Sequence, residues 1–124
     1  MEPKIEIIGL GGAGDINQLP LGIYRKLMNE SITCYVRTMD HPVINTLQKE
    51  AILFESFDDI YEKHDQFEAV YQEIAKILVA KAKTNGNIVY AVPGHPMLAE
   101  QTVQLLLKNT EVKVEIIGGS KLSG

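Results

Sequence analysis

The stretch that decides the fold is residues 66–92, which reads QFEAVYQEIAKILVAKAKTNGNIVYAV. Apolar residues repeat every three or four positions in its first part, which predicts an amphipathic helix over residues 66–83. Asn85 and Gly86 then end the helix and turn the chain. Asn87–Val92 is a continuous apolar run, typical of a strand that is covered on both faces of a parallel sheet. A helix that returns directly to a buried strand indicates the crossover connection of an α/β fold.

The same alternation extends along the chain on both sides of this stretch. Further strands are predicted at residues 4–9, 32–37, 51–57 and 112–117, and further helices at residues 21–29, from His41-Pro42 through Leu47, at 58–62 and at 97–108. Crossovers between parallel strands are right-handed, and they place helices over a sheet. The sequence therefore predicts an α/β three-layer sandwich, with a mostly parallel five-stranded sheet and helices on both faces.

Size and composition limit the class of protein. A chain of 124 residues with 45% apolar and 23% charged residues suffices for one compact domain. The net charge is −4, with acidic and basic residues mixed along the chain, so a broad nucleic-acid-binding surface is not expected. No apolar stretch reaches the ~20 residues of a membrane span, and the first residues lack a secretory signal. The single cysteine, Cys34, lies in an apolar run and is predicted to be buried. A cytoplasmic protein fits these observations.

A glycine-rich segment, GLGGAGD, follows the first predicted strand, at the end of the sheet where parallel folds bind ligands. Gly9, Gly11 and Gly14 match the dinucleotide fingerprint G-x-G-x-x-G. However, Pro20 marks a helix that begins too late for its amino terminus to face a pyrophosphate, and no acidic residue ends the second strand. No Gly-Lys-Ser/Thr sequence follows, so this is not a P-loop. A nucleoside without a phosphate chain suits the segment better than NAD, and a tight turn without a ligand is the alternative.

A second candidate loop, Val92-Pro93-Gly94-His95-Pro96, follows the fourth predicted strand and points to the same edge of the sheet. Two prolines around a glycine define a stiff turn, which loses little entropy when it binds a ligand. The imidazole of His95 is able to donate a hydrogen bond to a ligand or to carry a proton. The alternative is a turn histidine bonded to a neighbouring carbonyl.

Other polar residues give weaker indications. The three histidines share no ligand spacing and no Cys/His cluster exists, so no metal site is predicted. Asp58 and Asp59 fit a solvated helix start, because acidic side chains favour helix amino termini. Arg37 and Thr38, at the end of the second strand, are expected near the site. No catalytic residue is identified.

Several separated motifs together resemble the tetrapyrrole (corrin/porphyrin) methylase family. The opening strand with its glycine segment resembles the first motif of that family, and YAVPGHP at residues 90–96 resembles its second. Four further segments narrow the resemblance: QLPLG at 18–22, RTMDHPV at 37–43, SFDDIY at 56–61 and AEQTVQLL at 99–106. Together they are similar to the bacterial branch in which the methylase domain precedes a MazG-type nucleotide pyrophosphohydrolase.

The resemblance implies an S-adenosylmethionine cleft between two α/β subdomains, with a tetrapyrrole-like or other small-molecule methyl acceptor in the same opening. It assigns cofactor contacts to three segments of this chain. The implied cofactor-binding residues are Gly11, Gly12, Ala13, Gly14, Asp15, Pro93, Gly94, His95, Leu98 and Ser120. Two of these depart from the family pattern, because Ala13 replaces a proline and His95 replaces the usual aspartate.

The family domain is about twice as long as this chain, within ordinary domain sizes. Residues 1–124 therefore correspond to the amino-terminal cofactor-binding subdomain, and the carboxy-terminal subdomain is expected to be absent. We expect an isolated subdomain to have little activity and to self-associate, as a homodimer, through an exposed apolar patch. Two other functions stay open: an NAD(P)-dependent oxidoreductase domain, and a non-catalytic ligand-sensing module that regulates a fused pyrophosphohydrolase.

Overall fold

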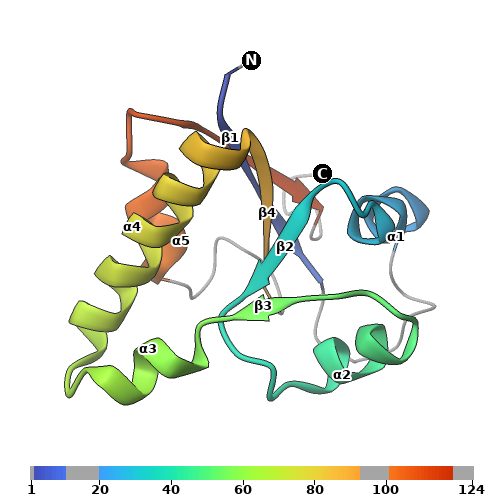
Figure 1. Cartoon of the computed structure of the whole chain (residues 1–124), viewed down its shortest axis with the longest axis horizontal. Helices are drawn as coiled ribbons and strands as arrows, with labels where there is room; N and C mark the ends of the chain where they lie inside the picture. The colour runs from blue at the N-terminus through green and yellow to red at the C-terminus, as the bar shows by residue number, and fades with distance from the viewer. Residues whose placement is uncertain (1, 11–19, 93–100, 119–124) are drawn as a thin grey trace, which may run out of the picture.

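The computed structural model describes residues 2–10, 20–92 and 101–118. Its elements follow one another as β1 (Lys4–Gly9), α1 (Leu21–Met28), β2 (Thr33–Val36), α2 (Pro42–Lys49), β3 (Glu55–Ser56), α3 (Asp58–Lys63), α4 (Phe67–Asn85), β4 (Asn87–Val92), α5 (Gln101–Leu107) and β5 (Lys113–Gly118). The strands form one sheet in the order β3-β2-β4-β1-β5, and every pairing is parallel. The predicted α/β three-layer fold with helices on both faces is confirmed (Figure 1).

Two apolar layers hold the helices on the sheet. On one face, α4 packs Val70, Ile74 and Leu78 against alternate residues of β1 and β4, and α5 lies beside α4. On the other face, α1 and α2 cover the intervening strand residues, including Ile8 and Val89. Successive strand residues point to opposite faces, so a continuous apolar run supplies both layers at once. Among the described helices, none is long and apolar enough to cross a membrane.

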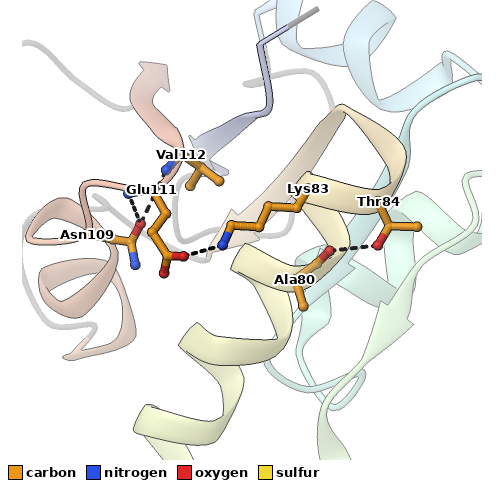
Figure 2. Close-up of polar contacts among 6 residues, drawn as sticks. All are labelled: Ala80, Lys83, Thr84, Asn109, Glu111 and Val112. Carbon is orange, nitrogen blue, oxygen red and sulfur yellow. Dashed lines mark hydrogen bonds and ion pairs between the residues drawn. The ribbon is translucent and has the colours of Figure 1, made fainter.

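Polar contacts join α4 to the turn after α5 (Figure 2). Lys83 on α4 pairs with Glu111, and both side chains are about half exposed. The Asn109 side-chain oxygen accepts hydrogen bonds from the main-chain N–H groups of Glu111, at 2.8 Å, and Val112, at 3.3 Å. The turn is therefore closed by Asn109 before β5 begins, whereas the exposed ion pair adds little because solvent screens it.

The face under α1 contains a buried charge. Glu6, in the middle of β1, has a side chain that is 3% exposed, and one of its carboxylate oxygens lies 2.9 Å from Lys26 Nζ on α1. An ionised carboxylate is costly to bury without a partner, so this pair fixes α1 over the sheet.

The predicted strand at residues 51–57 is wrong except for Glu55 and Ser56. Its first residues instead close helix α2. Ala51 has a φ of 69° and its N–H donates to the carbonyl of Gln48, while the N–H of Ile52 donates to the carbonyl of Leu47. This arrangement is a Schellman motif, with Ala51 in the left-handed position that glycine usually occupies.

Candidate functional site at the carboxyl edge of the sheet

Three strands end side by side at one edge of the sheet. Gly9 at the end of β1 is in register with Val92 at the end of β4 and with Gly118 at the end of β5. One residue further, the N–H of Leu10 donates to the carbonyl of Val92 at 2.8 Å. The chain therefore leaves β1 and β4 at neighbouring points, where the glycine-rich segment and the proline-glycine segment begin. Both points lie on the edge at which parallel sheets bind ligands.

All ten residues that the family resemblance implies as cofactor contacts lie outside the described residues. Their individual roles therefore stay predictions. The described residues determine where their segments start: Gly9 and Leu10 precede the first segment, Val92 precedes the second and Gly118 the third. Two of the three strands end in glycine, which has no Cβ, and Gly9 itself is buried.

The end of β2 adds a fourth part to the same edge. Val36 is in register with Ala91 of β4, so Arg37 follows at the level of Val92 and Thr38 one residue beyond it. That these two residues lie near a bound ligand stays a prediction. The N–H of Phe57 donates to the carbonyl of Val36 at 3.2 Å, which joins the start of α3 to this edge.

Asp58 fastens the turn after β2, a role that the sequence did not reveal. Its Oδ2 accepts a hydrogen bond from the N–H of Met39 at 3.1 Å. Partial burial alone would raise the pKa of this carboxyl, but hydrogen bonds from Thr38, Met39 and Ser56 lower it below its ordinary value. Asp59, beside it in the first turn of α3, is exposed as predicted. In the sequence, the one indication that Asp58 matters was its position in the SFDDIY segment, which contributes to the family resemblance.

The described histidines have local partners. The Nδ1 atom of His41 accepts the N–H of Val43 at 3.2 Å and so caps α2. His64 bonds to Glu73, which also pairs with Lys63 at 2.9 Å. Within the described ranges, no group of three or more His, Cys, Asp or Glu residues is arranged to hold a metal ion.

Cys34 is buried, as predicted. Its side chain lies in the layer under α1 and α2, and burial raises the pKa of its thiol to about 11. A thiol with that pKa is almost entirely protonated near neutral pH, so Cys34 is a packing residue and not a nucleophile.

An all-parallel sheet with helices on both faces defines an α/β domain of the class that binds ligands beyond the carboxyl ends of its strands. The sequence pattern of the Tetrapyrrole (Corrin/Porphyrin) Methylases matches residues 4–120, and the chain belongs to this family. It is also 56% identical, over 122 residues, to the uncharacterized protein YabN of Bacillus subtilis (strain 168). That match covers 96% of this chain and 24% of YabN.

Two solved structures share the fold. A uroporphyrin III C-methyltransferase from Thermus thermophilus superposes with a TM-score of 0.62 at 22% identity, over 94% of this chain and 48% of that one. A second structure of uroporphyrin-III C-methyltransferase from Thermus thermophilus gives 0.61 at 20% identity, over 96% and 48%. The chain thus spans about a quarter of YabN and about half of each methyltransferase.

Proposed function

We propose that this chain is the cofactor-binding half of a methyltransferase and that it holds S-adenosylmethionine at the carboxyl edge of its sheet. One observation supports this most: in a member of the tetrapyrrole methylase family, the strands that precede all three implied cofactor segments end in register at Gly9, Val92 and Gly118. A ligand at this edge would lie beside the strand ends from which all three segments start.

The edge suits an adenosyl compound for a chemical reason. Gly9 and Gly118 carry no Cβ at the ends of two of these strands, and we expect peptide groups of the segments that follow to bond the polar atoms of a nucleoside. When bound, S-adenosylmethionine supplies an electrophilic methyl group on sulfur. The protein's task is then to hold the acceptor's nucleophilic atom in line with that methyl, and positioning of this kind provides most of the acceleration.

The chemical class of acceptor proposed here is a tetrapyrrole or a related small molecule, in keeping with the family. The remaining cleft wall is proposed to come from a second subdomain, since the related methyltransferase chains are about twice as long. We therefore expect residues 1–124 alone to bind the cofactor but to give little or no methylation in a turnover assay with tetrapyrrole precursors. Robust turnover by this chain alone would contradict the proposal that a second subdomain is needed to complete the cleft.

The direct test is calorimetric titration of the chain with S-adenosylhomocysteine, NAD and NADP in parallel. The proposal predicts saturable binding of S-adenosylhomocysteine and none of either dinucleotide at the same concentrations. Tight binding of NAD alone would instead favour the oxidoreductase alternative. Absence of binding by any adenosyl ligand would favour a non-catalytic module.

A pair of glycine variants separates a site effect from a general one. Gly94→Ala, in the second cofactor segment, is expected to weaken S-adenosylhomocysteine binding by roughly tenfold, which corresponds to about 1.4 kcal/mol. Gly22→Ala is the matched control, because an added Cβ at this α1 position meets no atom within 4 Å. The control is expected to leave the affinity unchanged.

A homodimer and a cytoplasmic location are part of the same proposal. Light scattering after size exclusion tests the first, and a monomer at high concentration would contradict self-association. A MazG-type domain beyond this chain is a further expectation from the family resemblance.

A further inference from the structure

A half-open hollow of about 620 Å³ lies at the opposite end of the sheet from the cofactor edge. It is formed by the last turn of α1, the first residues of β2 and the segment that leads from α2 into β3. Thr33, on its wall, is in register with Ile88, four residues before Val92 on β4. At the rise of a parallel strand, four residues separate the hollow from the proposed cofactor edge by about 13 Å along the sheet.

The wall of the hollow is mainly apolar. Leu27, Ile32 and Ile52 contribute to it, and two large side chains at its margin are exposed to solvent: Met28, at 41%, and Leu53, at 86%. Small-molecule sites are concave, mostly apolar and roughly 300–1,000 Å³ in volume, with a few polar groups that select the ligand. The hollow has the size and the lining of such a site.

The charged residues that line the hollow are both acidic. Glu30 and Glu55 line it, and neither forms an ion pair with a described residue. Among the described residues that line it, none is Lys, Arg or His. The carboxyl end of helix α1, at Met28, also points there, and the final carbonyls of a helix carry partial negative charge.

Two basic residues lie in the last turn of α1, outside the lining of the hollow. These are Arg25 and Lys26, and Lys26 pairs with the buried carboxylate of Glu6 on the sheet. An apolar wall with carboxylates at its rim complements a molecule that combines an apolar body with a positive charge.

We propose that this hollow is a second ligand site, separate from the cofactor edge, and that it binds a small organic cation with an apolar body, such as an alkylammonium compound. The apolar body lies against Met28, Ile32 and Leu53, which expose apolar surface, and the ammonium group faces Glu30 and Glu55. This site does not depend on the proposed methyl transfer.

The test uses three probes of equal length: hexylammonium, hexanol and hexanoate, each titrated into the isotopically labelled chain and followed by NMR. The proposal predicts saturable shifts of the main-chain amides of Glu30, Thr33 and Leu53 with hexylammonium. It also predicts that hexanoate binds roughly tenfold more weakly or not at all, because its charge is repelled where the ammonium is attracted. Hexanol is expected to fall between the two.

The double variant Glu30→Gln/Glu55→Gln is expected to weaken hexylammonium by roughly fivefold or more and to leave hexanol unchanged. Its matched control is Glu62→Gln/Glu68→Gln, which removes the same two charges from exposed positions outside the hollow. Leu53→Ser is expected to weaken all three probes. Equal binding of hexylammonium and hexanoate, equal effects of the two double variants, or no saturable shift at these amides would each overturn the proposal.

Discussion

The two ends of the sheet are built in opposite ways. At the amino end the strands begin with Lys4, Asn87 and Lys113 in register, and the partly exposed Glu115 of β5 lies 3.2 Å from Lys4 of β1 and 3.8 Å from Lys113 of its own strand. At the carboxyl end the strands finish at Gly9, Val92 and Gly118, of which Gly9 and Val92 are buried. One parallel sheet thus has an amino end with exposed charged side chains and an uncharged carboxyl end from which the implied cofactor segments start.

The largest expected loss of stability comes from truncating a buried side chain in the middle of a strand. Ile7 is fully buried in the middle of β1, while its neighbour in register on the edge strand β5, Ile116, is 36% exposed. Ile7→Ala is expected to lower the free energy of unfolding by about 2–5 kcal/mol, because it removes buried methylenes and leaves a cavity. Urea unfolding of both variants gives the comparison.

Ile116→Ala is the matched control, and its expected cost is only about 1 kcal/mol, since the side chain is already partly in water. Equal costs for the two variants would mean that the side chain of Ile116 is buried in solution, which would contradict its partly exposed position on β5.

A smaller loss of stability is expected at Gly86, where helix α4 ends and the chain turns into strand β4. Gly86 ends α4 with a φ of 93°, and its carbonyl accepts the N–H of Lys4 at the amino end. Gly86→Ala is expected to destabilise the chain by roughly 1–3 kcal/mol in thermal unfolding, because a side chain is strained at that φ.

The opposite substitution, alanine to glycine, is expected to raise the stability at Ala51. Ala51 already stands in a left-handed position, so Ala51→Gly is expected to stabilise the chain by about 0.5–1 kcal/mol, the released strain exceeding the added entropy of the unfolded glycine. A destabilised Ala51→Gly variant would show that the Schellman motif does not form as described.

The smallest predicted change in stability is at Asp58, near the carboxyl end of β2, and it depends on pH. Hydrogen bonds lower the pKa of Asp58 below its ordinary 3.8 in the folded chain. Its contribution to stability is therefore present above pH 3.8 and is lost as the pH falls through the lowered pKa. The difference in stability between the native chain and Asp58→Asn should be constant near neutral pH and shrink on acidification.

The control is Asp59→Asn, which removes an exposed carboxylate from the same helical turn. It should show a smaller and flatter difference across the same pH range. If Asp59→Asn gave the larger loss on acidification, the hydrogen bond from Met39 to Asp58 would not be the stabilising contact.

Some strands of the sheet could be predicted from the sequence and others could not. Lys4–Gly9 and Asn87–Val92 were predicted to the residue, because each is a β-branched apolar run bounded by glycine or Asn-Gly. The strand at residues 51–57 failed because its pairing with β2 involves only Glu55 and Ser56, while Ala51 and Ile52 close α2. Pairing of that kind is a tertiary contact, which local propensity does not encode.

For the candidate site, the motifs predicted two loops at one edge of the sheet. The strands that precede these loops end there in register, Gly9 with Val92, and the contacts of the loops themselves stay a prediction. The roles of Glu6 and Asp58 were not visible, because their partners, Lys26 and Met39, lie 20 and 19 residues away in sequence. The hollow at the other end was also hidden, since three separate segments form it and none carries a recognisable motif.

The central claim is that an adenosyl ligand binds at the carboxyl edge, and mapping by NMR tests it most directly. On titration with S-adenosylhomocysteine, the largest amide shifts among the described residues should occur at Leu10, Val92 and Gly118. The amides of Lys4 and Lys113, at the amino end of the same strands, should stay in place. Saturable binding with its largest shifts at the amino end, or no binding at all, would contradict the account.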